Sequence, residues 1–211
     1  MYPTMELRWF LPGPPPESIQ NWFQSIEGAE TNEANREDRY LSLPLATLGI
    51  KQRQDAIEIK QRIAKGKVQR LTKGIKGQVE QWVKWSFPLD GQQSQPNLTL
   101  PPGTWITIQK SRQLKRYGVL PDGTVTAMAD SETAEQSCTL ELTNLWLAEQ
   151  QWYSLGLEAS GPEDHLGETL MQVTQAVFSG SDAPLLKGKD SYGYPKWLTR
   201  LLKEFKSRLS V

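Results

Sequence analysis

The chain has very little cysteine and histidine, the residues from which disulfide frameworks, thiolate metal clusters and histidine-based catalytic sites are built. Its 211 residues include one cysteine, Cys138, and one histidine, His165. A single cysteine excludes an internal disulfide and any multi-cysteine metal cluster. Cys138 has apolar neighbours on its own face, so we expect a small core residue. His165 falls at an expected helix start, where a surface or capping role is the simpler interpretation.

Net charge and long apolar runs are also missing. Lys and Arg together number 24, as do Asp and Glu, so no overall field steers the protein toward nucleic acid or an anionic membrane. No run approaches the roughly 20 apolar residues that a membrane helix needs. Glu6 and Arg8 interrupt the first apolar stretch, so we expect no signal peptide. These features predict a cytoplasmic protein with no nucleic-acid partner and no membrane partner, and they leave the oligomeric state open.

Three stretches have helical periodicity, and most of the remainder has the pattern of strands. Helices are predicted around residues 19–26, 166–177 and 195–209, each with apolar residues recurring on one side. Two segments rich in turn-forming residues, 28–35 and 90–103, are expected to be loops. The basic stretch 65–76 lacks interleaved aromatic residues and is expected to be a solvated hairpin loop. We predict one domain over residues 1–211, with the last helix packed on a β-sheet.

The predicted strands alternate between apolar and ionic residues. In an extended strand, side chains two positions apart lie on the same face. In the first strand, Leu7 and Trp9 lie opposite Glu6 and Arg8, and later strands repeat the pattern. The ionic face collects nine cations and five carboxylates: Arg8, Lys51, Arg53, Lys60, Arg62, Lys84, Lys110, Arg112 and Arg116, with Glu6, Glu58, Glu80, Glu141 and Glu158. The strand from Trp105 to Tyr117 is less regular, because its Ile106 and Ile108 share parity with Lys110 and Arg112, and a bulge or a twist is expected there.

Two architectures explain this alternation. One is an open antiparallel sheet with its core on one side and water on the other. The second is a sheet closed on itself with the ionic face inward and the helices covering the apolar outer wall. In that case the enclosed charges must be paired with one another, hydrated, or neutralised by an anion that occupies the cavity. Converging Arg and Lys groups favour phosphate, and leftover carboxylates favour Mg²⁺ or Mn²⁺, which prefer oxygen ligands.

Several segments, taken in order, resemble the CYTH superfamily of triphosphate tunnel metalloenzymes. Thr4-Met5-Glu6-Leu7-Arg8 resembles the family's opening Glu-x-Glu-x-Lys strand. Four further segments resemble later strands of the family: Glu37 to Leu41, Gly49 to Arg53, Ile57 to Lys60 and Cys138 to Thr143. Gly156-Leu157-Glu158-Ala159 is similar to the family's following Glu-x-Glu strand. The resemblance covers about residues 4–178.

The resemblance implies an α+β fold, a closed or nearly closed eight-stranded antiparallel β-barrel with helices packed on the outside. It also implies a metal-dependent triphosphatase that binds a triphosphate or a phosphorylated small molecule in a basic tunnel. Glu6 and Glu158 would be catalytic, and Glu6, Glu141 and Glu158 would hold Mg²⁺ or Mn²⁺. The phosphate-binding residues would be Arg8, Lys51, Arg53, Lys60, Arg62, Lys84, Lys110 and Arg112.

The chain departs from the family pattern at three acidic positions. Thr4, Thr143 and Gly156 stand where the family has carboxylates. Three remaining carboxylates with waters suffice for one Mg²⁺, but a second metal loses its ligands. Two functions therefore stay open. One is metal-dependent hydrolysis of the ligand, and the other is a non-catalytic module that binds a phosphorylated ligand after losing part of the metal site.

Overall fold

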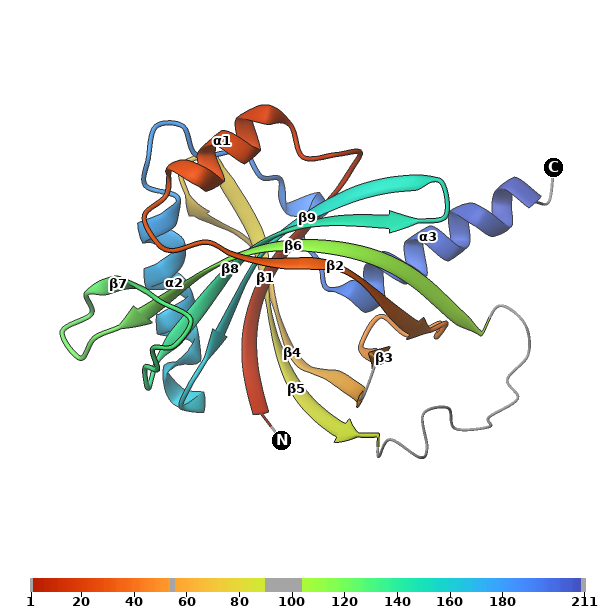
Figure 1. Cartoon of the computed structure of the whole chain (residues 1–211), viewed down its shortest axis with the longest axis horizontal. Helices are drawn as coiled ribbons and strands as arrows, with labels where there is room; N and C mark the ends of the chain where they lie inside the picture. The colour runs from red at the N-terminus through yellow and green to blue at the C-terminus, as the bar shows by residue number, and fades with distance from the viewer. Residues whose placement is uncertain (1, 54–55, 90–103, 210–211) are drawn as a thin grey trace.

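A computed structural model describes residues 2–53, 56–89 and 104–209. It contains nine strands, three α-helices (Figure 1) and two short 3₁₀ helices at Glu163–His165 and Gly188–Asp190. In chain order the longer elements are β1 Tyr2–Pro12, α1 Glu17–Ser25, β2 Thr31–Leu41, β3 Leu48–Arg53, β4 Ala56–Thr72, β5 Ile75–Pro88, β6 Trp105–Val119, β7 Val125–Met128, β8 Ser137–Leu147, β9 Gln150–Ser160, α2 Leu166–Val177 and α3 Tyr194–Leu209.

Eight of the strands form a closed antiparallel barrel. The strands follow the order β2-β3-β4-β5-β1-β9-β8-β6, and β2 pairs again with β6 to close the ring. The short β7 pairs with the end of β6, beyond the residues of β6 that pair with β2. Closure leaves no open sheet and confirms the predicted barrel. With its inward-facing charges, the barrel has the tunnel fold that the resemblance predicts.

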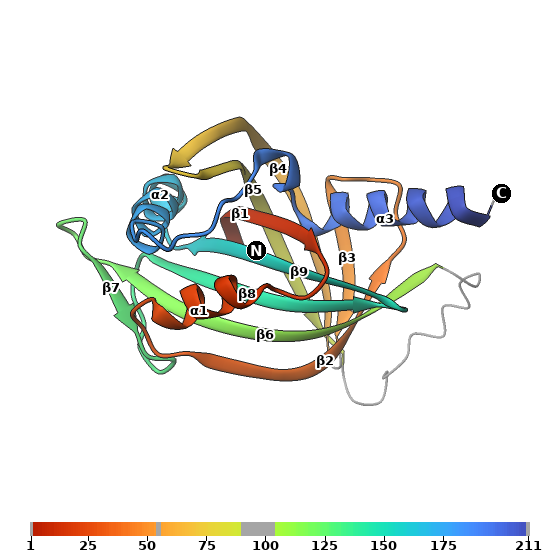
Figure 2. The same cartoon turned by 90° about the horizontal axis from the view of Figure 1, so that it is seen from above.

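The alternation along β1 shows how the barrel sorts its side chains. Leu7 and Trp9 are fully buried in a core between the outer wall and the helices α1 and α2. The intervening Glu6 and Arg8 line the lumen and are also buried. Both faces of this strand are therefore covered, one by helices and one by the far wall of the barrel. In Figure 2, α1 and α2 lie toward one end of the barrel and α3 toward the other.

A second apolar cluster closes one end of the lumen beneath α3. Phe10 of β1 stacks on Trp197 of α3, with ring centroids 4.8 Å apart, and Ile106 and Ile108 of β6 join the same cluster. Residues 109–118 of β6 pair with β8 in regular register. The predicted bulge in β6 was therefore wrong, because Ile106 and Ile108 face inward like Lys110 but at the apolar end of the lumen. The register shift lies on the partner strand β2, between Glu33 and Arg36.

Three other expectations from the sequence need correction or fall outside the described residues. The predicted loop 28–35 contains the start of β2 at Thr31, and the basic stretch 65–76 belongs mostly to the long strands β4 and β5. The predicted loop 90–103 lies outside the described residues. None of the helices in the described part of the chain is long and apolar enough to cross a membrane.

Candidate functional site

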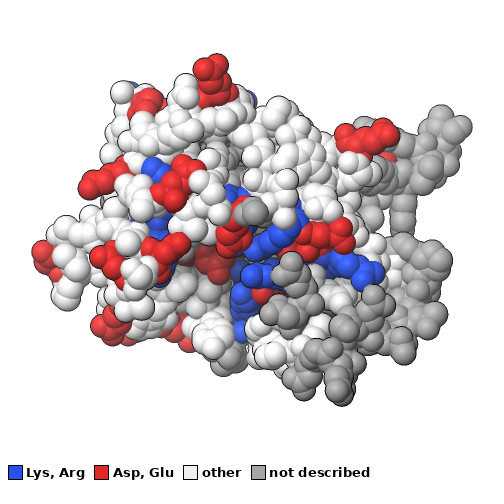
Figure 3. Space-filling model, viewed as in Figure 1, with Lys and Arg blue, Asp and Glu red and all other residues white. Residues whose placement is uncertain are grey.

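A cavity of about 190 Å³ occupies the barrel lumen. Residues from β1 to β6, β8, β9 and the start of α3 line it, so segments from the whole chain converge there. Figure 3 shows Lys and Arg gathered at the centre of one face of the molecule, flanked by Asp and Glu. The cavity wall contains eight cations and four carboxylates: Arg8, Arg36, Lys51, Arg53, Lys60, Lys84, Lys110 and Arg112, with Glu6, Glu58, Glu141 and Glu158.

Seven of the eight predicted phosphate-binding residues line this cavity, and Arg62 does not. Arg62 forms an ion pair with Glu80, whose side chain is 3% exposed. The other carboxylate oxygen of Glu80 accepts a hydrogen bond of 3.1 Å from the backbone N–H of Gly193. Arg62 therefore holds the segment that leads into α3, which is a structural task.

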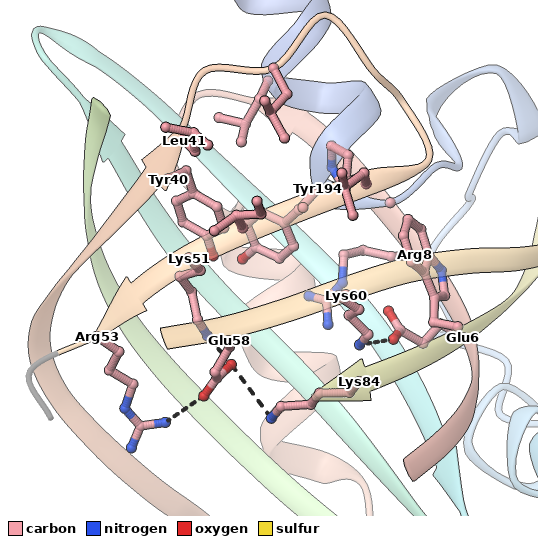
Figure 4. Close-up of a pocket in the computed structure, with 18 of the residues that line it drawn as sticks. Glu6, Arg8, Tyr40, Leu41, Lys51, Arg53, Glu58, Lys60, Lys84 and Tyr194 are labelled. Atoms are coloured by element: carbon pink, nitrogen blue, oxygen red, sulfur yellow. Dashed lines mark ion pairs between the residues drawn. The ribbon is translucent and has the colours of Figure 1, made fainter. Parts of the chain in front are cut away.

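One carboxylate, Glu58, is shared by three cations. Its oxygens lie 2.7 Å from Lys51 Nζ, 3.5 Å from Lys84 Nζ and 3.9 Å from the Arg53 guanidinium. Figure 4 shows these cations turned toward Glu58 from β3 and β5. Burial acts to raise the pKa of Glu58, but the charges and hydrogen bonds of Lys51 and Lys84 together outweigh it, and the pKa lies below its usual value. Even with Asp38 as a second partner of Lys51, the positive charges outnumber the negative ones, so this wall of the cavity is cationic.

A second cluster surrounds Asp38, which has no exposed surface. Its carboxylate lies 2.9 Å from Lys110 Nζ, 3.3 Å from the Arg36 guanidinium and 3.9 Å from Lys51 Nζ. Burial lowers the pKa of Lys110 to about 8, against the pull of Asp38. Burial and then the charge of Lys110 lower the pKa of Lys51 to about 8 as well. Both lysines therefore stay protonated at neutral pH but release protons in mildly alkaline solution.

Lys60 joins the two carboxylates predicted to be catalytic. Glu6 of β1 and Glu158 of β9 are direct cross-strand partners, and both form ion pairs with Lys60. Burial, the largest effect, raises the pKa of Glu6, and the nearby charge of Glu158 adds to it. For Glu158, the charges of Lys60 and Arg8 outweigh burial, so its pKa is lowered. The pair therefore depends on Lys60 to hold two negative charges side by side.

Arg8 separates Glu141 from that pair. Its guanidinium lies 2.7 Å from Glu141, and Arg112 approaches the other oxygen of Glu141 at 2.9 Å. The charges of these arginines overcome burial and lower the pKa of Glu141 well below its usual range. Arg8 packs directly over Gly156, where an added Cβ would come within 2.7 Å of the guanidinium carbon. A side chain at position 156 would therefore take the space that Arg8 fills.

The three predicted metal ligands are not gathered at one point. Glu6 and Glu158 face Lys60, whereas Glu141 is held by two arginines. Thr143, which stands at one of the departures from the family pattern, donates a hydrogen bond of 2.6 Å to Glu141. In the described part of the chain, no three Asp, Glu, His or Cys residues are placed to hold a metal ion together. As folded, this donor set fits ion pairing and does not fit a metal shared by Glu6, Glu141 and Glu158.

Three buried nitrogen donors on residues that line the cavity make no hydrogen bond with the described residues. They are Nε of Arg8, Nε of Arg36 and Nε1 of Trp82. Unsatisfied buried donors are costly and rare in native proteins. These unpaired donors and the excess of cations therefore favour a bound anion or water that accepts hydrogen bonds.

The predicted site residues do not include four residues of this site. Arg36, Tyr40 and Tyr194 line the cavity, and the buried Asp38 lies directly behind it. The strand parity of Arg36, Asp38 and Tyr40 is a usable signal, because all three share one face of β2. No strand pattern identifies Tyr194, since it enters from the start of α3.

Comparisons with known proteins add likenesses of fold. No family model matches the chain, and no curated protein does. The chain is similar to the PH1819 protein from Pyrococcus horikoshii OT3, with 11% identity, 95% of this chain and 99% of that chain covered, and a TM-score of 0.42. It is also similar to the Hippeastrum protein HpAC1, described as an adenylyl cyclase candidate with a dominant triphosphatase activity, with 10% identity, 83% and 88% covered, and a TM-score of 0.37. A third likeness is to the Pct1 RNA triphosphatase from S. pombe, with 11% identity, 99% and 83% covered, and a TM-score of 0.35.

Proposed function

We propose that the barrel lumen binds a triphosphate or another phosphorylated small molecule. The observation that carries this proposal is the charge of the cavity wall, where eight cations meet four lining carboxylates and two further ones, Asp38 and Glu33, that pair with them, so positive charge remains in excess. In an enclosed space of low dielectric, such an excess is unfavourable unless an anion compensates it. A chain of phosphates suits the site because its oxygens are distributed along a line, as the cations are along the lumen.

Different cationic residues of the cavity wall would make different contacts with the ligand. Arg53 and Lys84 share the carboxylate of Glu58 with Lys51, which also pairs with Asp38, so a phosphate that enters near Arg53 and Lys84 gains contacts without breaking a balanced ion pair. Arg8 lines the same cavity, and its Nε makes no hydrogen bond with the described residues. Lys60 can turn from Glu6 and Glu158 toward a phosphate only at the cost of leaving those carboxylates close together. We therefore assign Lys60 the double role of binding the ligand and keeping this pair charged.

Hydrolysis with a divalent metal is the second step of the proposal. Glu6 and Glu158 lie next to each other on adjacent strands and are the residues on which turnover depends in this hypothesis. Glu6 and Glu158, as neighbours, would be the residues to hold a divalent metal without Glu141, and the metal would neutralise charge on the phosphates. The alternative is a module that binds the phosphorylated ligand without turning it over.

Calorimetry with tripolyphosphate tests the binding step. Arg53→Gln and Lys84→Gln should each weaken binding about tenfold, because each removes one charge-assisted contact. Lys67→Gln removes an exposed charge on β4 outside the cavity wall and should change affinity less than twofold. Equal effects of the three substitutions, or no binding by the unaltered protein, would falsify the proposal.

Phosphate release distinguishes hydrolysis from binding alone. Tripolyphosphate, ATP and thiamine triphosphate are each incubated with the protein, with and without Mg²⁺ or Mn²⁺. Metal-dependent release that disappears in Glu158→Gln supports hydrolysis. Binding without release under every condition supports the non-catalytic module.

A further inference from the structure

The lumen cavity has an apolar end as well as a cationic wall. We define the leucine end as Leu41, Leu43, Leu45, Leu48, Ile50 and Leu198, all of which line the same cavity as the cations. Leu41 is the last residue of β2 and Leu48 the first of β3, so most of this surface comes from one hairpin. Leu198 comes from α3 and is 6% exposed. The hairpin and the helix meet where Gly49 approaches Pro195.

Two tyrosines connect the leucine end with the charged part of the cavity. The rings of Tyr40 and Tyr194 stack with centroids 5.7 Å apart and an interplanar angle of 7°. Lys110 Nζ lies 4.2 Å from the Tyr194 centroid and 4.8 Å from that of Tyr40. In Figure 4, Leu41 and Tyr40 lie toward one end of the cavity, and Arg53, Glu58 and Lys84 lie toward the other. The cavity therefore passes from charge through aromatic rings to aliphatic side chains.

An apolar surface of this kind is unfavourable when it faces water. Leu45 is 48% exposed at the cavity, although the rest of the leucine end is partly or fully buried. An inorganic polyphosphate would satisfy the cations but leave these aliphatic groups hydrated. A ligand that carries a hydrocarbon group next to its phosphates would cover both surfaces.

The leucine end also limits the chemistry of the group that fits there. Its six side chains carry neither hydrogen-bond donors nor acceptors. A nucleobase buried against them would leave its polar edge unpaired, which costs binding free energy. A hydrocarbon group has no polar edge, so its burial at this surface leaves no hydrogen-bonding group unpaired.

Building on the proposed phosphate binding, we propose that the physiological ligand is a diphosphate or triphosphate ester of an apolar, aliphatic alcohol. Its phosphates lie among the cations of β3, β4 and β5, and its hydrocarbon chain lies against the leucine end. The hairpin that joins β2 to β3 is thus the specificity-determining element of the site.

A pair of probes with the same headgroup tests this assignment. Dissociation constants of methyl diphosphate and octyl diphosphate are measured by calorimetry on the full chain, with inorganic tripolyphosphate as a third probe. Each methylene that is fully buried should strengthen binding about fourfold. We expect octyl diphosphate to bind at least about tenfold more tightly than methyl diphosphate.

Substitutions in the hairpin locate the effect. Leu43→Ser and Leu45→Ser should reduce the advantage of the octyl chain at least about threefold and leave the affinity for tripolyphosphate unchanged. Leu185→Ser is the matched control, because Leu185 is 79% exposed and does not line the cavity. It should leave every affinity unchanged.

The outcomes separate this inference from the proposed function. If tripolyphosphate binds but the octyl chain adds nothing, or if Leu185→Ser reduces its advantage as much as Leu45→Ser does, the aliphatic ligand is wrong and phosphate binding stands. If none of the three probes binds, the proposed function itself fails.

Discussion

Arg8 shows how a single residue changes what the lumen can do. It lies over Gly156 and pairs with Glu141, so a guanidinium fills the space between Glu141 and the pair formed by Glu6 and Glu158. The absence of a side chain at position 156 is what permits this placement. At this position the chain has a guanidinium in the midst of its acidic residues.

Gly156→Ala tests that placement. The added Cβ would lie 2.7 Å from the Arg8 guanidinium carbon, so Arg8 must move and its contact with Glu141 must weaken. We expect the free energy of unfolding in urea to fall by about 1–3 kcal/mol, the usual cost of overpacking. Gly66→Ala is the matched control on β4, because its added Cβ meets only ordinary contacts beginning at 3.5 Å. Equal stability of the two variants would contradict the close packing of Arg8 on Gly156.

Lys60 and Arg62 are neighbours on the same face of β4 but have different tasks. Lys60 lines the cavity, whereas Arg62 pairs with the buried Glu80. Lys60→Gln should weaken tripolyphosphate binding at least about tenfold. Arg62→Gln should lower the free energy of unfolding by about 3 kcal/mol, because it leaves a buried carboxylate without its cation. Calorimetry and urea unfolding on both variants check the assignment, and a loss of affinity in Arg62→Gln at full stability would reverse it.

At the scale of the elements, strand alternation predicts which residues face the lumen, because side chains two apart lie on one face. That rule correctly placed Lys51, Lys60 and Lys84 in the cavity wall. It cannot predict which charges meet, because pairing depends on the register between strands. It therefore did not separate Arg62 from Lys60, and it gave no reason to expect Arg8 beside Glu141.

Features that come from helices and connections were harder to predict. On the sequence alone, Tyr192, Tyr194 and Trp197 near the last helix fit two interpretations, a cover for one mouth of the tunnel or an anchor for the helix. In the structure Trp197 stacks on Phe10 of β1 and so anchors the helix, whereas Tyr194 lines the cavity. The leucine end lies on a connection between two strands, where periodicity carries no information.

The packing of α3 against one end of the barrel predicts what happens when Trp197, the residue that anchors the helix, is truncated. Trp197 is 1% exposed and stacks on Phe10. Trp197→Ala should lower the free energy of unfolding by about 3–5 kcal/mol, the usual cost of such a cavity. Leu185→Ala, at a position with 79% exposure, should change it by less than about 0.5 kcal/mol. The free energy of unfolding is measured in urea for both variants. A small effect of Trp197→Ala would mean that α3 does not stabilise the barrel.

At the scale of the whole molecule, the protein separates its charges in space. The chain has no net charge, yet the cations lining its cavity outnumber the carboxylates by two to one. Attraction of an anion is therefore local to the lumen and depends on the protonation of buried lysines. Two of these, Lys51 and Lys110, have a pKa of about 8, which makes the whole cavity sensitive to pH.

This sensitivity predicts opposite effects of pH on binding and on stability. Above pH 8 the two lysines lose their charge, so affinity for an anion should fall. Stability should respond in the other direction. Because the folded pKa of these lysines lies below the usual 10.5, the unfolded chain binds more protons between pH 8 and 10.5, and their contribution to stability rises with pH in that window. The charged and titratable groups that face the two lysines are Arg36, Asp38, Tyr40, Glu58, Glu141 and Tyr194.

Methyl triphosphate is a suitable probe for the binding arm, because its terminal phosphate titrates at about pH 6 and its charge is constant above that range. Its affinity should decrease steadily from pH 7.5 to 9.5, and binding at pH 8.5 should take up protons, seen as a dependence of the calorimetric heat on the buffer.

Lys51→Arg keeps a charge at that position throughout the range, so the affinity of this variant should decrease less steeply. Lys67→Arg, an exchange at an exposed position outside the cavity wall, should follow the unaltered protein. An affinity that stays constant to pH 9.5, or a Lys51→Arg profile identical to that of the unaltered protein, would show that Lys51 and Lys110 do not control the charge of the lumen.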